Sequence, residues 1–223
     1  MFFDFLESTI KEYNIDFDCI YGADEAGFMP GCACTSKVIG KAGKKTQHRK
    51  ESGNQQLITV MLTICADGTS IPPLVIFAEK MCRIGYQRKG YMDGELGVDW
   101  AKHFDCYTKD KMGDCDRLIE RIHVICYPSH ATHLNQGLDV VIFGILKQYF
   151  SKEMIDFESQ TGQVVCKENF LSVYAPAHIA AFTPTNIKAA FAKTGIHPFN
   201  REAIDLTAMK PSIESHTNRP VTP

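Results

Sequence analysis

The pattern of apolar and polar positions predicts two strongly amphipathic helices. In the segment 138–158, apolar residues stand at positions 138, 141, 142, 145, 146, 149 and 150, which is the spacing of one helical face over several turns. We therefore expect a long helix there, packed against the core. The segment 2–13 shows the same period, and its apolar face consists of Phe2, Phe5, Leu6 and Ile10.

Two further helices are expected in the C-terminal part of the chain. The segment 167–182 is predicted to be helical, and Pro176 should kink or divide it. The Thr-Pro pair at 183–184 suits the N-cap and first turn of the next helix, which should end at Gly195. The residues from Pro211 onward are expected to be disordered.

Shorter runs of β-branched and aromatic residues predict four strands. These runs are 19–24, 57–68, 70–80 and 121–129. The second and third are joined by Asp67-Gly68, which predicts an antiparallel hairpin. The pair Pro72-Pro73 should make the start of the third strand irregular or place it at a sheet edge. Strands followed by helices indicate an α/β or α+β domain with a mixed sheet.

The composition is that of a globular protein of 223 residues, with 44% hydrophobic and 22% charged residues. The length fits one large domain or two small ones. The formal net charge of −2 creates no overall attraction to nucleic acid or membranes, so a polyanion would need a local basic patch. Acids interrupt the N-terminal apolar run and no stretch has the length of a membrane span, so we expect an intracellular protein.

Nine cysteines occur in the chain. In an intracellular compartment we expect them to be reduced thiols. The pairs Cys32/Cys34 and His130/His133 could suggest zinc. An interpretation without zinc is favoured, because the sequence has no paired C-x-x-C and no second cluster at metal-ligand spacing.

Two carboxylates at the ends of predicted elements are the candidate chemistry. Asp24 ends the strand 19–24, and Asp139 lies in the first turn of the helix 138–158. If the fold brings them together, they form an oxygen-rich site suited to Mg²⁺ or Mn²⁺. Each acid also has an ordinary alternative, since Asp139 suits the helix dipole and Asp24-Glu25 could form a turn.

A basic segment at 37–50 contains no acid. Its cations are Lys37, Lys41, Lys44, Lys45, Arg49 and Lys50. Such a loop can bind a phosphate backbone without reading its sequence, although a solvated loop is an equal alternative. His130 and His133, just before the long helix, could position a phosphate or a metal-bound water, but such residues more often hold a loop by hydrogen bonding.

Four stretches of the sequence carry a family resemblance. They read IYGADEAGF at 20–28, LITVMLTICADGTSIPPLVIFAEK at 57–80, YPSHATHLNQGLDVVIFGILK at 127–147 and NIKAAFAKTGIHPFN at 186–200. Over about residues 3–205, the chain resembles the DDE superfamily endonuclease domain of pogo/Tigger/jerky-type transposases, in the mariner/pogo superfamily, particularly fungal members. Gly22 stands where the family has asparagine, and Ser129 and Gly137 replace two prolines.

This resemblance implies an RNase H-like α/β fold, a mixed sheet flanked by helices, and a function in cutting transposable-element DNA. Three acids would bind two divalent ions, Mg²⁺ or Mn²⁺, with Asp24 as the first and Asp139 as the third, while Glu25 points away. The residues expected to contact DNA are Lys41, Lys44, Lys45, Arg49, Lys50, His130 and His133. The resemblance further implies a nuclear protein and allows a homodimer, with no membrane and no small-molecule substrate.

The chain departs from the family pattern in two places. The second acid and its D-G-H-x-S-H motif are absent, so we expect an incomplete sheet with one central strand and a helix shortened or lost. Asp114 or Asp116 could substitute as a ligand. We also expect no counterpart of the N-terminal helix-turn-helix domain with which the family reads transposon ends. The expected division is a lead-in helix at 1–16, the domain at 17–205 and a tail at 206–223.

Three functional alternatives stay open from the sequence. The first is a degenerate nucleic-acid-binding domain with impaired catalysis, which we expect. The second is an active Mg²⁺-dependent enzyme of DNA strand cutting and strand transfer. The third is a non-catalytic remnant or truncated gene product, and the target DNA and host role are not determined by the sequence.

Overall fold

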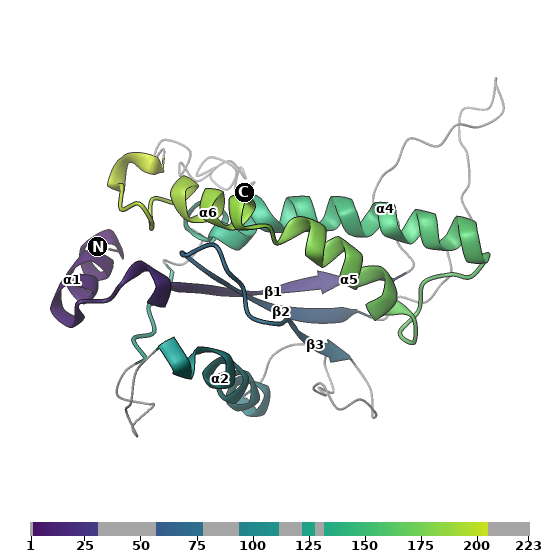
Figure 1. Cartoon of the computed structure of the whole chain (residues 1–223), viewed down its shortest axis with the longest axis horizontal. Helices are drawn as coiled ribbons and strands as arrows, with labels where there is room; N and C mark the ends of the chain where they lie inside the picture. Colours follow the sequence, from purple (N-terminus) through teal and green to yellow (C-terminus); the bar gives the residue numbers. More distant parts are fainter. Residues whose placement is uncertain (1, 31–56, 78–93, 112–121, 128–131, 205–223) are drawn as a thin grey trace, which may run out of the picture.

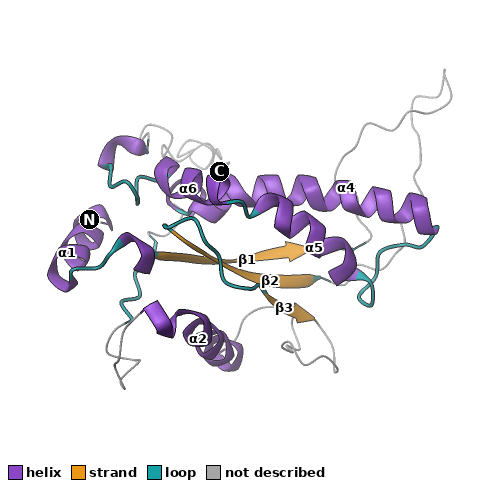
Figure 2. Ribbon diagram, in the orientation of Figure 1, coloured by secondary structure: helices purple, strands orange, loops and turns teal. Residues whose placement is uncertain are grey.

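The computed structural model describes residues 2–30, 57–77, 94–111, 122–127 and 132–204. These residues form a mixed α/β structure around a three-stranded sheet. Figure 1 shows helices on both sides of this sheet, and Figure 2 shows the same arrangement by secondary structure. One side carries α4 (Phe143–Thr161), α5 (Phe170–Ala181) and α6 (Pro184–Lys193), and the other carries α2 (Gly94–Thr108).

The sheet has the order β1-β2-β3. Its strands are β1 (Tyr21–Phe28), β2 (Ile58–Cys65) and β3 (Leu74–Phe77). All eight residues of the central strand β2 are buried, as expected for a strand covered on both faces. Both pairings within the described residues are antiparallel, so the expected mixed sheet is not what these strands form. The reason is local for β2 and β3, because a tight turn can join only antiparallel neighbours.

The predicted hairpin is confirmed. β2 and β3 pair directly, and the turn between them contains Asp67, whose Oδ1 accepts a hydrogen bond from the Thr69 backbone N–H at 2.7 Å. Gly68 adopts a φ of 96°, which a residue with a side chain rarely takes. The ladder of β3 begins only at Leu74, after the proline pair, so the irregular start is confirmed as well.

The first strand is longer than predicted. We expected it to end at Asp24, but β1 continues to Phe28, and Asp24 pairs with Leu62 in mid-strand. The strand continues because Ala26 and Phe28, which follow the two acids in the chain, are both buried and pair with β2. Apolar burial on alternate positions therefore carries the strand past a carboxylate pair.

The long helix predicted from 138 is confirmed, with a local variation at its start. Its first turn, η4 (Leu138–Ile142), is a π-helix that runs directly into α4. The side chains that this helix buries are Leu138, Ile142, Phe143, Leu146, Phe150 and Met154. Most follow a spacing of four residues, which is the stripe that faces the sheet and α5. The helix ends at Thr161 and is capped by Gly162, whose φ is 67°.

Both predicted C-terminal helices form, but α5 begins at Phe170, three residues later than expected, and is not divided at Pro176, while α6 ends at Lys193, two residues before Gly195. α5 contains Pro176, which lies on the exposed side of the helix. α6 begins at Pro184, and the Thr183 hydroxyl accepts a hydrogen bond from the Asn186 backbone N–H at 3.2 Å, as an N-cap should. The following Gly195 has a φ of 70°, and a Cβ there would overlap the Asn200 carbonyl oxygen.

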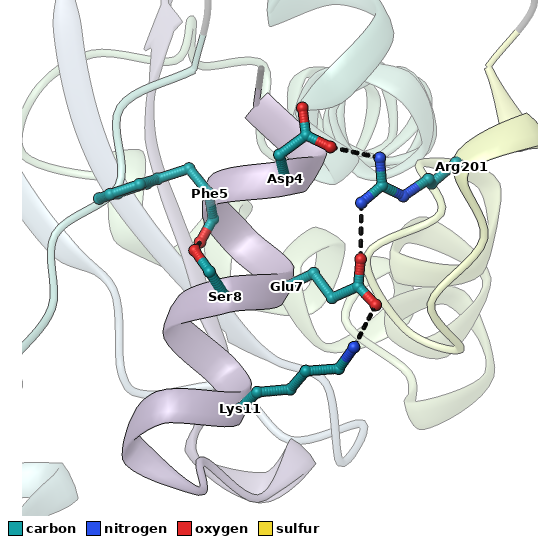
Figure 3. A network of polar contacts seen from close by, with 6 residues as sticks. All are labelled: Asp4, Phe5, Glu7, Ser8, Lys11 and Arg201. Atoms are coloured by element: carbon teal, nitrogen blue, oxygen red, sulfur yellow. Dashed lines mark hydrogen bonds and ion pairs between the residues drawn. The ribbon is translucent and has the colours of Figure 1, made fainter.

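The N-terminal helix α1 (Phe2–Tyr13) is confirmed, but its predicted apolar face is partly wrong. Leu6 is buried, whereas Phe5 is 58% exposed and Phe3 packs against the core in its place. Figure 3 shows that α1 is tied to the short helix η5 (Arg201–Ala203) near the end of the described chain. Arg201 donates to Asp4 at 2.5 Å and to Glu7 at 2.6 Å, and Lys11 donates to the second oxygen of Glu7 at 2.6 Å.

The helix α2 was not predicted. Its buried apolar residues include Leu96 and Phe104, and Phe104 packs edge-to-face against Tyr21 of β1, with ring centroids 5.0 Å apart. His103 Nε2 lies 2.8 Å from the Pro72 carbonyl oxygen, which ties α2 to the β2–β3 connection. The helix continues into η2 (Lys109–Lys111), where the Lys111 ammonium donates to Asp67 at 2.5 Å.

The strand expected at 121–129 is wrong for the residues that the structure describes. Residues 122–127 form no strand and pair with no described strand. Val124 is 77% exposed, while Ile125 and Tyr127 pack against the core. The segment is therefore held to the core by side-chain packing and not by backbone hydrogen bonds to a strand. The expected tail from Pro211 lies outside the described residues.

Candidate functional site

Asp24 faces the layer formed by the C-terminal helices. Alternate residues of a strand share one face, so Asp24 lies on the same face of β1 as Gly22 and Phe28. The Phe28 ring packs edge-to-face against Phe150 of α4, with centroids 5.0 Å apart. A Cβ at Gly22 would lie 3.8 Å from the Phe191 ring of α6. Asp24 is therefore held between two positions that contact the helices.

Asp139 comes to this region through the π-helical turn η4. The turn packs against β1, and its neighbour Leu138 is buried, while Asp139 itself is exposed. One hydrogen bond holds the chain next to this turn against β1: the Gln136 side-chain amide donates to the Ala23 carbonyl oxygen at 3.2 Å. This bond joins the residue before Asp24 to a residue three positions before Asp139.

Gly137 allows the turn to sit close to α6. A Cβ on Gly137 would lie 3.0 Å from the Ala190 carbonyl oxygen and 3.1 Å from its carbonyl carbon. Backbone atoms cannot be displaced by a side-chain rotation, so a side chain at this position would push the turn and α6 apart by a few tenths of an ångström. Gly137 has helical dihedral angles, which any residue can adopt. Its role is therefore to leave room for the close contact with α6.

The charge of Asp139 acts on the Asp24 carboxyl. Burial raises the pKa of the Asp24 carboxyl, the backbone N–H of Glu25 lowers it, and the negative charge of Asp139 raises it again. The Gln136 amide also stabilises the charged form by hydrogen bonding. The net direction is upward, which means that ionised Asp24 is held in an unfavourable environment. Its role as a metal ligand stays a prediction.

Tyr127 is a polar neighbour that the sequence reasoning did not select. Its hydroxyl oxygen lies 3.9 Å from the Cβ position of Gly22, on the Asp24 face of β1. Burial raises the pKa of the phenol to about 12, and the charge of Asp24 contributes to the rise. Gln136 was likewise not selected, although it stands within the quoted stretch 127–147. A neutral side chain gives no sequence signal comparable to that of an acid.

Other predicted site residues cannot be compared with the structure. The basic segment with Lys41, Lys44, Lys45, Arg49 and Lys50 lies outside the described residues, as do His130, Asp114, Asp116 and the Cys32/Cys34 pair. The backbone of His133 lies in the short helix α3 (Thr132–Asn135). In the described part of the chain, no group of three or more His, Cys, Asp or Glu side chains is arranged to hold a metal.

Comparison with known proteins gives one curated relative of interest. The chain is similar to the MFS-type transporter clz9 of Cochliobolus lunatus, with 26% identity over 226 aligned positions, covering 86% of this chain and 25% of the transporter. The chain therefore spans about a quarter of the length of this relative. No protein-family model matches the chain, and no solved structure matches it. Among the described residues, no helix combines the length and the apolar character needed to cross a membrane.

These findings overturn the interpretation as a transposase. The curated protein that aligns with most of the chain is an MFS-type transporter, so the resemblance to a DDE endonuclease domain is wrong. Three functional expectations depended on this resemblance and are therefore also wrong. They are DNA cutting, nucleic-acid binding and a transposable-element origin. The structure suggests why the quoted stretches misled: they contain a buried strand pair, an Asp-Gly turn and an amphipathic helix, which stabilise any α/β core.

Proposed function

We propose that this chain forms an α/β domain that binds one divalent cation, Mg²⁺ or Mn²⁺, between Asp24 and Asp139. The observation that carries the proposal is the environment of Asp24, a half-buried carboxylate whose pKa is raised by burial and by the charge of Asp139. A half-buried carboxylate and a second carboxylate close to it disfavour each other's charge. A cation between them removes this repulsion and replaces lost hydration.

The residues present suit a hard cation that keeps part of its water shell. Mg²⁺ is commonly bound through one or two carboxylates and retains several waters. Asp139 is exposed, so water can complete the coordination from its side. A soft metal such as zinc is not supported, since no cysteine or histidine cluster accompanies the two acids in the described residues.

The surroundings of the pair support a site whose shape is set before binding. Gln136 fixes the turn against β1, and Gly137 lets the same turn pack closely on α6. The π-helical turn that carries Asp139 is a rare local structure, and such turns occur frequently at functional sites. A preformed site loses less entropy when the ion binds.

The test is Mn²⁺ titration of the isotope-labelled protein, followed by NMR. Mn²⁺ is paramagnetic, so amide signals near Asp24 and Asp139 should broaden first. Asp24→Asn and Asp139→Asn should each abolish this selective broadening. Glu25→Gln is the matched control, because it removes a neighbouring carboxylate that points to the opposite face of the same strand. The selective broadening should be retained in Glu25→Gln, with a slightly changed pH dependence, because the charge of Glu25 also contributes to the raised pKa of Asp24.

The pH dependence of binding follows from the same carboxyl. Because the pKa of Asp24 is raised, protons compete with the cation, and affinity should increase with pH until Asp24 is fully ionised. Broadening that persists in Asp24→Asn, or that is equally lost in Glu25→Gln, would reject the assignment of the site.

A second proposal concerns the molecular context of the domain. We propose that it acts as one part of a larger transporter-type protein, since 86% of the chain aligns with a quarter of an MFS-type transporter. An antibody against the domain should detect, in cells, a band much larger than 25.0 kDa in the membrane fraction. A single band at 25.0 kDa that stays in the supernatant would contradict this proposal.

The finer fold assignment also stands as a proposal. Three consecutive antiparallel strands followed by a long helix support an RNase H-like order, and an experimental structure of the whole chain would test it. The nuclear location and the homodimer stay predictions, which microscopy and analytical ultracentrifugation can check.

A further inference from the structure

We propose that the side-chain carbonyl oxygen of Gln136, Oε1, is a third ligand of the cation held between Asp24 and Asp139. The inference rests on the proposed cation site and adds a neutral oxygen to its two carboxylates. Within the described part of the chain, no third His, Cys, Asp or Glu side chain joins these acids in a metal-binding group. An amide carbonyl is a suitable addition, because carboxylate, carbonyl and water oxygens are the ligands that suit Mg²⁺ and Mn²⁺.

The Gln136 side chain lies at the peptide bond that leads into Asp24. Its Nε2 donates a hydrogen bond to the Ala23 carbonyl oxygen at 3.2 Å, and this carbonyl belongs to the peptide unit between Ala23 and Asp24. Only 5% of Gln136 is exposed, and the neighbouring turn η4 packs against β1. The amide is therefore enclosed beside the backbone of the first carboxylate.

The same residue lies at the start of the turn that carries the second carboxylate. The backbone carbonyl oxygen of Gln136 accepts a hydrogen bond from the Val140 backbone N–H at 3.0 Å, and Gly137 has helical dihedral angles. Residues three positions apart on a helical surface are neighbours, with Cβ atoms about 5–6 Å apart. Asp139 is therefore adjacent to Gln136 on this turn, and Gln136 stands between the two acids.

The chemistry of the amide decides which of its two ends contacts Ala23. A carbonyl oxygen can only accept, so the nitrogen of Gln136 must be the end that faces it. Oε1 is bonded to the same carbon as Nε2 and is the end that remains for another partner. Among the residues that the structure describes, none donates a hydrogen bond to Oε1. A polar atom of a buried side chain without a protein partner calls for a water or an ion.

Two substitutions of Gln136 separate a ligand from a purely structural contact. Gln136→Met and Gln136→Glu nearly keep the length of the side chain, and both lose the donor to Ala23, but only glutamate keeps an oxygen at the position of Oε1. If Oε1 is a ligand, Gln136→Glu should bind the cation at least as tightly as the natural protein. Gln136→Met should lose at least the roughly tenfold in affinity that is typical of groups supporting metal ligands.

The measurement is Mn²⁺ titration followed by NMR, with thermal unfolding in Mg²⁺ as a second readout. Without a cation, Gln136→Glu should be less stable than Gln136→Met, because its added charge lies near two carboxylates. Mg²⁺ should then raise the melting temperature of Gln136→Glu more than that of Gln136→Met. Gln148→Glu is the matched control, since Gln148 is exposed on α4 and the variant adds the same charge away from the site. It should bind Mn²⁺ as the natural protein does.

The outcomes distinguish this inference from the proposed function. Equal loss of Mn²⁺ affinity in both Gln136 variants, or unchanged affinity in Gln136→Met, would overturn the ligand role and leave the Asp24–Asp139 site standing. Absence of selective broadening in the natural protein would instead reject the cation site itself, and the ligand role with it. If Gln136→Met does not fold, Gln136→Glu decides alone: a gain in affinity over the natural protein supports the ligand role, and any other result overturns it.

Discussion

Replacement of Gly137 by alanine tests whether the close approach of η4 and α6 is required. The added Cβ would lie 3.0–3.1 Å from the backbone oxygen, the carbonyl carbon and the Cβ of Ala190. These atoms belong to a helix backbone and its first side-chain atom, so no rotamer change can relieve the contact. The two elements would have to separate by a few tenths of an ångström.

Two opposing effects determine the size of the change. Alanine in place of glycine within a helix stabilises by roughly 0.5–1 kcal/mol, because it restricts the unfolded chain. Overpacking of a close contact costs about 1–3 kcal/mol. Gly144 supplies the matched control, since it lies in α4, is exposed, and would place a Cβ with no atom within 4 Å. Gly144→Ala should therefore be stabilised by the restricted unfolded chain without the cost of overpacking.

The assay is urea unfolding of both variants beside the natural protein. Gly137→Ala should be less stable than Gly144→Ala by about 1–3 kcal/mol, with equal m-values. The reasoning would be refuted if Gly137→Ala were as stable as Gly144→Ala. A displaced η4 should also weaken Mn²⁺ binding, because Asp139 is carried on that turn, whereas Gly144→Ala should bind as the natural protein does.

Three further predictions concern single contacts. Arg201→Ala should lower the melting temperature at low salt, and the difference should shrink near 1 M salt because the ion pairs with α1 are exposed. Thr183→Ala should cost about 1 kcal/mol in urea unfolding through loss of the N-cap, while Thr183→Ser should retain it. Burial would raise the pKa of Asp67, but hydrogen bonds from Lys111 and Thr69 lower it to about 2. This stabilisation is present above the ordinary pKa of 3.8 and is lost as pH falls toward 2, so Lys111→Met should show a flatter stability curve across that range.

The sequence alone determined those elements whose rules are local. The helix from Leu138 follows from an apolar stripe, the β2–β3 hairpin from Asp67-Gly68, and the start of α6 from the cap at Thr183. For the hairpin and the cap the deciding interactions join residues only a few positions apart, and for the helix the signal is the short period of its apolar residues. Such interactions have nearly the same free energy in any surrounding structure, so the pattern predicts them.

Tertiary contacts decided the elements that the pattern predicted wrongly or not at all. β1 continues past Asp24 because Phe28 is buried against α4, and α1 turns Phe5 to solvent because Phe3 packs against Phe199, with ring centroids 5.8 Å apart. α2 depends on the contact of Phe104 with Tyr21. These partners are distant in the chain, and their contribution exists only once the layers are assembled.

The same division applies to the candidate site. Asp24 and Asp139 were selected by chemical type and by a resemblance that proved wrong, and neither source could show that they approach each other. Their proximity depends on the packing of η4 against β1, where the Gln136 amide donates to the Ala23 carbonyl oxygen. Burial and neighbouring charge set the pKa of a carboxyl, and both quantities are properties of the folded surroundings instead of the residue itself.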